Sequence, residues 1–197
     1  MKSITLTALG LTGSQWIKRL ETEGYKISEY AKQVLNSPDY DCERMKKGEK
    51  VTVQFVSVKD LNQTVATTQE IKDFAKTKGW EMPKGELALL IREAISDKQM
   101  EDMGVYYIEA LHEPINDSVG NPRVLIADRY DGGRWVDAYW GDPSRQWYGS
   151  GAFAFPLVAS PSYSDTQPSF DSSSLEQRVE ALEKWQQKFI GFAKNDL

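Results

Sequence analysis

The chain has 197 residues, 40% of them hydrophobic, a composition typical of folded globular proteins and a length that suits one sizeable domain with or without appendages. The net charge of -5 argues against a nucleic-acid or anionic-membrane binder. No apolar run approaches the roughly 20 residues of a membrane span. With one cysteine, Cys42, and one histidine, His112, an internal disulfide and a zinc site of thiolates and imidazoles are excluded.

The first hundred residues are expected to be mostly helical. Ser14 is a candidate N-cap of a first helix, which Gly24 would end. Ser28 is the candidate cap of a second helix, which Pro38 would close. The apolar spacing predicts an inward face on each helix, made of Trp16, Ile17 and Leu20 on the first and Tyr30, Ala31, Val34 and Leu35 on the second. This pair resembles a helix-turn-helix in outline, but "EYAKQVL" offers few side chains for base edges, which favours simple helical packing.

Further elements follow toward residue 104. "VTVQFVSV" (51–58) alternates apolar and polar residues and predicts a strand. Thr67-x-x-Glu70 is a capping box that begins another helix, which Gly79 would end. A helix is expected after Pro83, followed by a short helical turn that begins at Ser96 and ends at Gly104.

The middle of the chain predicts antiparallel β-structure. Strands are expected at 105–111 and 152–158, with a hairpin between them. Asp131-Gly132-Gly133 supplies the residues that a tight hairpin turn requires. The fold class is therefore expected to be α+β, with a helical N-terminal part, an antiparallel sheet and a C-terminal helix.

The C-terminal region predicts two further segments, which divide the chain into a domain at 1–160, a Ser/Pro-rich linker at 161–173 and a helix at 174–197. A helix of about three heptads is too short to be stable alone in water. We therefore expect the segment 174–194 to form a homo-oligomer, with a trimer favoured. Its apolar stripe consists of Leu175, Val179, Leu182, Trp185, Phe189 and Phe192.

Residues 132–155 combine aromatic side chains with Gly, Asp, Ser and Pro. Strand alternation places Val136 and Ala138 on an inward face and Asp137 and Tyr139 on the outward face. The stretch that follows is rich in turn-forming residues and is expected to cross the surface as a loop. Rigid aromatic rings beside small polar residues are typical of binding surfaces. Four rings are assigned to the core: Trp135, Trp147, Phe153 and Phe155.

The frame GRW-x-x-A-x-x-x-x-P-x-x-x-W-x-x-x-x-x-F-A-F, which begins at Gly133, resembles the variable region of target proteins of bacterial diversity-generating retroelements. The chain from "TGSQWIKRLETEGYKISEYAKQVL" to "AFAF", about residues 10–158, is similar to small bacterial proteins of uncharacterised function that carry such regions. Trp140 and Gln146 depart from the family pattern, because adenine changes in an asparagine codon do not reach them, and Ala152 stands where glycine is expected. The added linker and helix also depart from it.

The resemblance implies a C-type lectin-like fold and a non-enzymatic protein that displays a diversifiable surface at 137–151. The ligand would be a protein or a glycan, and no cofactor, metal or catalytic residue is expected. The ligand-binding residues that follow from the resemblance and from the composition of the loop are Asp137, Tyr139, Trp140, Gly141, Asp142, Ser144, Gln146, Tyr148, Gly149 and Ser150.

Three alternatives stay open. The aromatic surface could serve as a subunit contact in a phage or intracellular assembly protein. A hydrolase could use His112 as a general base with Glu113, Asp128 or Asp131 as its partner, although no nucleophile motif accompanies it. Asp128, Asp131, Asp137 and Asp142 could gather around calcium, but they lack the spacing of a known calcium loop. The first residues lack a secretory cleavage pattern, which favours a cytoplasmic or virion-associated protein.

Overall fold

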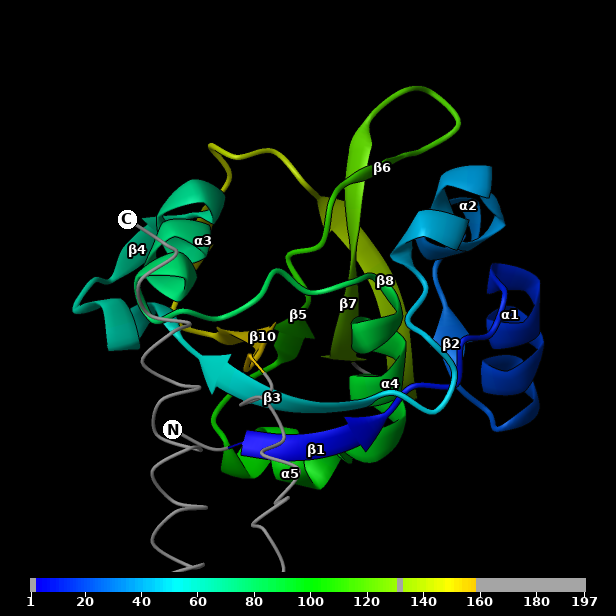
Figure 1. Ribbon diagram of the computed structural model, residues 1–197, viewed down its shortest axis with the longest axis horizontal. Coiled ribbons are helices and arrows are strands. Elements are labelled where there is room, and N and C mark those ends of the chain that lie inside the picture. The colour runs from blue at the N-terminus through cyan, green and yellow to red at the C-terminus, as the bar shows by residue number, and fades with distance from the viewer. Residues whose placement is uncertain (1–2, 131–132, 159–197) are drawn as a thin grey trace, which may run out of the picture. The chain divides into compact units, whose positions relative to one another are not determined.

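A mixed sheet lies at the centre of the computed structural model, which describes residues 3–130 and 133–158 (Figure 1). The chain divides into two units, Met1–Ala159 and Ser160–Leu197. The second unit lies outside the described residues, and so do the linker expected at 161–173 and the oligomerisation helix expected at 174–197.

The main sheet has eight strands, and most neighbours in it are antiparallel. Two pairs are parallel, β10 with β5 and β2 with β8. This topology confirms the expected α+β class with a mostly antiparallel sheet. Along the sheet the order is β1 (Ser3–Thr7), β3 (Lys50–Val56), β10 (Gly151–Pro156), β5 (Tyr107–Glu109), β7 (Pro122–Tyr130), β8 (Gly133–Trp140) and β2 (Lys26–Ile27), and β6 (Ile115–Asn116) pairs with β7 beside this path.

One face of the sheet packs on helices. The α4 helix contacts β7 and β8, and α2 also contacts β8 (Figure 1). Val136 and Ala138 are buried on this face, as the alternation of the strand predicted. Burial of such apolar surface is the main source of stability. The helices associated with this core are α1 (Gly13–Thr22), α2 (Glu29–Asn36), α4 (Glu86–Ala94) and α5 (Asp97–Asp102), with a 3₁₀ turn, η1, at Pro38–Glu43.

The opposite face carries a second, smaller core. Trp147, Phe153 and Phe155 are buried in it, which confirms three of the four rings assigned to the core. The fourth, Trp135, is only partly buried, beneath the ammonium group of Lys26 5.2 Å from its ring centroid. The elements of this second core are α3 (Thr68–Thr77), a 3₁₀ turn η2 (Val58–Leu61) and a two-stranded sheet of β4 (Val65–Thr67) and β9 (Gln146–Tyr148).

The helix caps agree with the sequence in most places. Thr67 and Glu70 form the expected capping box, and Ser28 and Ser96 cap α2 and α5. The cap of α1 is a correction, because it is Thr12 and not Ser14. The Thr12 hydroxyl accepts from Gln15 N–H, and the Gln15 side chain accepts from Thr12 N–H, so that two free helix-end donors are satisfied.

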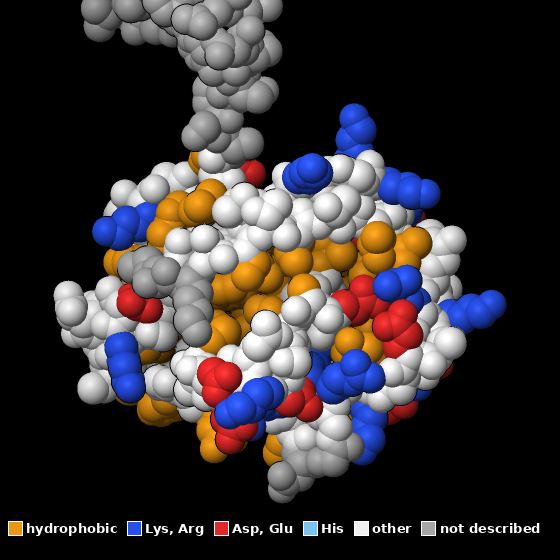
Figure 2. All heavy atoms as spheres, turned by 90° about the horizontal axis from the view of Figure 1, so that it is seen from below, with side chains coloured by type: hydrophobic (Ala, Val, Ile, Leu, Met, Phe, Trp, Pro, Cys, Tyr) orange, Lys and Arg blue, Asp and Glu red, His pale blue; other side chains and the backbone are white. Residues whose placement is uncertain are grey.

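Two other sequence expectations change. Tyr30, expected on the inward face of α2, is 47% exposed, and its ring lies against the guanidinium of Arg123. The strand expected at 105–111 is confined to Tyr107–Glu109, and the one expected at 51–58 ends at Val56. Figure 2 views the molecule from below, the side of β1 and α5, and shows a band of hydrophobic side chains between charged margins.

Candidate ligand-binding surface

The stretch after β8 crosses from the main sheet to the small one and back. It leaves β8 at Trp140, pairs as β9 with β4 in antiparallel register, and enters β10 at Gly151. Two of its carbonyl groups, on Pro143 and Arg145, accept from backbone N–H groups in the first turn of α3. These are donors that a helix cannot satisfy internally. The loop is therefore held against the helix by its backbone, independently of most of its side chains.

A local turn shapes the exposed part of the loop. The Asp142 carboxylate accepts from both the backbone N–H and the hydroxyl of Ser144, at 2.7 and 2.6 Å. The Ser144 hydroxyl and N–H lower the pKa of the Asp142 carboxyl, because they bind its charged form. Arg145 N–H then donates to the Asp142 carbonyl, which closes the turn.

Trp147 anchors the loop to the second core. It is 2% exposed, and its indole N–H donates to the Thr68 hydroxyl at 2.8 Å. Its ring meets Phe153 edge-on at 5.6 Å and stacks with Tyr139 at 6.3 Å between centroids. The guanidinium of Arg145 lies 4.4 Å from the Trp147 centroid, which adds a cation–π contact.

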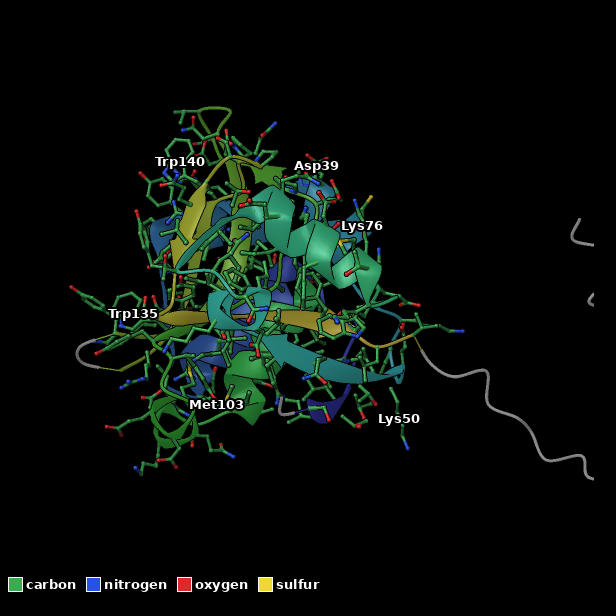
Figure 3. All side chains as sticks on the ribbon, turned by 90° about the vertical axis from the view of Figure 1, so that its left-hand side faces the viewer. Asp39, Lys50, Lys76, Met103, Trp135 and Trp140 are labelled. Atoms are coloured by element: carbon green, nitrogen blue, oxygen red, sulfur yellow. The ribbon has the colours of Figure 1, made fainter. Side chains whose placement is uncertain are left out.

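Strand alternation turns the neighbours of Trp147 outward. Gln146 and Tyr148 flank the buried ring in β9 and are both exposed, Tyr148 to 57%. Trp140, at the end of β8, is 43% exposed, and Figure 3 shows it at the opposite end of this strand from Trp135. The outward set of the ten expected binding residues is therefore Trp140, Asp142, Ser144, Gln146, Tyr148 and Ser150.

The other four expected residues lie deeper. Gly141 is buried, and a Cβ added there would lie 2.8 Å from Cγ of Pro114, so its assignment as a changeable surface position is corrected. Tyr139 is half-buried and packs on the second core instead of pointing freely into solvent. Asp137 and Gly149 are also partly buried. Close packing, which the strand pattern alone does not reveal, decides all four positions.

Beneath the loop, one face of β5, β7 and β8 carries acidic and phenolic side chains. Register places Tyr107 opposite Asp128, and Ile126 between Glu109 and Asp137. The Tyr139 hydroxyl donates to the Asp128 carboxylate at 3.3 Å. Burial and, next to it, the charge of Asp137 raise the pKa of Asp128 to about 6. Burial likewise raises the pKa of Tyr139 to about 12.

Glu109 is the most unusual member of this face. Its side chain is fully buried, and neither carboxylate oxygen accepts a hydrogen bond from the described residues. Burial raises its pKa well above the usual range, against the opposing charges of Arg145 and Lys72. The protonated, neutral form is therefore favoured. Because no atom of this side chain reaches solvent, Glu109 cannot act in a surface reaction centre.

The raised pKa of Asp128 predicts a stability that depends on pH. Below pH 3.8, the ordinary pKa of this carboxyl, the folded and unfolded states are both protonated at Asp128. Between about pH 3.8 and 6 only the folded state keeps the proton, so the free energy of unfolding falls as pH rises through this range. Asp128→Asn removes this titration and keeps an acceptor for Tyr139. Between pH 4 and 7 the variant should gain about 2 kcal/mol of unfolding free energy relative to the parent, once solvent screening of the carboxylate is counted.

Urea unfolding at a series of pH values measures this difference. Asp137→Asn serves as a second arm, because it removes a charge that raises the pKa of Asp128 and should reduce the loss seen in the parent chain. Parallel stability curves for the parent and Asp128→Asn would contradict the prediction.

His112 is engaged entirely in backbone hydrogen bonds. Its Nε2 accepts from Leu125 N–H at 2.8 Å, so that Nδ1 carries the proton and donates to the Glu113 carbonyl at 2.7 Å. The ring is fully buried, which lowers its pKa to about 4. A Glu43 oxygen lies 3.5 Å from Nδ1, but the neutral ring makes no ion pair with it. A general base needs an accessible nitrogen, and this arrangement offers none.

Sequence reasoning missed several residues that build this surface. The sequence predicted no role at this surface for Arg145, Tyr107 or Glu109, and β9 was expected to be an irregular loop. Their signal was weak, because a single glutamate in "YYIEAL" indicates a buried site only when both faces of the sheet are known to be covered. For β9, the one indication of a strand in the sequence was the apolar Trp147 between Gln146 and Tyr148.

In the part of the chain that the structure describes, no group of three or more His, Cys, Asp or Glu side chains could hold a metal ion, and no helix is long and apolar enough to span a membrane. Comparison with family models, curated proteins and solved structures finds no match to this chain, so that its own residues carry the functional argument.

Proposed function

We propose that this chain is a non-enzymatic ligand-binding protein that displays the exposed side chains of residues 140–150. One observation carries the proposal: the backbone of this segment is fixed by α3, β4 and Trp147, while six of its side chains are exposed, those of Trp140, Asp142, Ser144, Gln146, Tyr148 and Ser150. A binding surface can change without loss of the fold when its backbone is fixed and its exposed side chains are free to vary. The resemblance to variable proteins of diversity-generating retroelements supports the same function.

Two finer parts belong to this proposal. The first is a C-type lectin-like fold, supported by the chain order of a strand, two helices and an antiparallel sheet with the display segment before its last strand. The second is the site of action, in the cytoplasm or on a virion. Should the exposed rings of Trp140 and Tyr148 prove to be buried against another subunit, the chain would instead be an assembly protein.

A combinatorial library tests the display function. Asp142, Ser144, Gln146, Tyr148 and Ser150 are randomised together, and the variants are presented on yeast. Most clones should be displayed at the level of the parent, because all five side chains are exposed. Selection against several unrelated purified proteins should then yield binders.

A second library provides the control for the first. It randomises Gly141, Trp147 and Gly151, which are buried, and should lose most of its displayed protein. The proposal would be contradicted if the first library were displayed as poorly as the second. It would also be contradicted if the first library, though well displayed, yielded no binder.

Oligomerisation through residues 174–194, which lie outside the described residues, is a further part of the proposal. The apolar stripe of that segment should be covered by copies of itself, and a trimer would raise weak binding through avidity. Light scattering should report a trimer for the full chain and a monomer for a chain that ends at Ser162. A monomeric full chain at micromolar concentration would refute this role.

A further inference from the structure

A polar groove of about 510 Å³ lies between α2 and the segment around β6, outside the display segment. A volume of this size is typical of sites for small ligands or short chains. The two walls are tied together, because the Gln33 side chain accepts from Ser118 N–H at 3.0 Å. Neutral amides and hydroxyls make up most of the lining: Gln33, Asn36, Ser37, Asn116 and Ser118.

The charged lining residues leave little net charge facing the groove. Asp117 is bound by Arg123, whose Nε donates to its carboxylate at 2.9 Å. Lys32 pairs with Glu21 at 3.0 Å. Glu29 remains as a carboxylate without an ion pair among the described residues. This balance disfavours phosphates and other anions.

Two exposed aromatic rings are linked to the groove through Arg123 and Asp117, and one of them, Tyr30, follows the lining residue Glu29 in α2. The guanidinium of Arg123 lies between them, 3.9 Å from the centroid of Tyr30 and 4.4 Å from that of Trp140. Arg123 is itself held by Asp117 of the groove lining, so that this guanidinium connects the two rings to the groove. Tyr30 and Trp140 remain 47% and 43% exposed, so each ring keeps surface for another molecule.

We propose that this groove and its two rings bind an uncharged oligosaccharide. A pyranose ring has an apolar C–H face, which stacks on aromatic rings, and hydroxyl groups at its edge, which bind amides, hydroxyls and carboxylates. Exposed rings near a groove that amides and hydroxyls line, with little net charge, match both features. The inference deepens the proposed binding function and shares Trp140 with it, but the other residues that carry it lie outside the display segment.

An array of defined oligosaccharides, some uncharged and some sialylated or sulfated, tests the ligand class. The full chain is tagged and clustered by an antibody, so that weak contacts add up. Binding to uncharged oligosaccharides is expected. The inference is overturned if the chain binds none of them, or binds only the anionic ones. Binding to a parallel peptide array without any saccharide binding would also overturn it.

Variants locate the binding on the structure. Tyr30→Ala and Trp140→Ala should each weaken binding to the best saccharide at least tenfold, and Asn36→Ala should weaken it measurably. Tyr30→Phe keeps the ring and should stay within threefold of the parent. Unchanged binding in both alanine variants would refute the site.

A matched control is available elsewhere on the surface. Tyr106 is 58% exposed and stacks on Arg129 at 4.7 Å, in the same manner as Tyr30 on Arg123. Tyr106→Ala should leave saccharide binding within twofold, and an equal loss would overturn the assignment to the groove. Failure of the display library with intact groove binding would remove the proposed function alone, and the reverse result would remove only this inference.

Discussion

Replacing Trp147 by alanine should lower the free energy of unfolding by about 3–5 kcal/mol, because it removes the largest side chain that joins the display segment to the second core. The ring is 2% exposed and contacts Phe153, Tyr139 and Tyr107, which would line the resulting cavity. The substitution also leaves the Thr68 hydroxyl without the indole donor. The neighbouring side chains cannot move far enough to fill this cavity, because they belong to α3 and β10, and the loss of stability should therefore be large.

Tyr148→Asp is the matched control, because it changes the adjacent residue of the same strand on the opposite face. Its ring is 57% exposed, so the loss should stay below about 1 kcal/mol. Denaturant unfolding of both variants at neutral pH gives the comparison. Equal losses for the two residues would show that the display segment is part of the core and would remove the basis of the display proposal.

Glu86→Ala should also cost about 3–5 kcal/mol, although it removes no large apolar group. The carboxylate is fully buried at the start of α4 and accepts three backbone N–H groups. These come from Gly10 and Met45 at 2.7 Å and from Leu9 at 3.2 Å. Alanine would leave all three donors without this partner, and each unsatisfied buried donor costs about 1–3 kcal/mol.

Glu49→Ala provides the control for Glu86, because the Glu49 carboxylate also accepts a backbone N–H, that of Lys46, but at an exposed position. Water can replace that bond, so the loss should be about 1 kcal/mol or less. Glu86→Gln should fall between the two alanine variants, since one amide oxygen remains as an acceptor while the amide nitrogen faces a donor. Thermal unfolding ranks the three variants by their loss of stability. A loss for Glu86→Ala no larger than that for Glu49→Ala would contradict the role of Glu86.

Much of the candidate surface could be anticipated from single residues, but its depth could not. Gln146, Tyr148, Asp142 and Ser144 are exposed, as expected for a turn-rich segment that crosses the surface. Gly141 was misread because its closeness to Pro114 depends on how β8 ends beside the segment before β6. Tyr139 was misread because a strand pattern separates two faces without saying whether both are covered.

The sequence by itself determined the local elements of this protein. The capping box of Thr67 and Glu70, the Ser28 cap and the positive φ of Gly24 after α1 each depend on residues within a few positions of one another. Such hydrogen bonds and backbone preferences act within one helical turn, and a pattern in the chain records them directly.

Only the tertiary structure decided what these elements bury. The Trp147 indole donates to the Thr68 hydroxyl, 79 positions away in the chain, and β9 forms because β4 supplies its partner strand. Glu109 is shielded from solvent only when β5 is enclosed from both sides, and the Tyr30 ring, although on α2, lies against Arg123 of the distant strand β7. Burial, strand pairing and contacts such as that of Tyr30 with Arg123 join segments that are distant in the chain, so their outcome depends on the packing of the whole fold, which no local pattern contains.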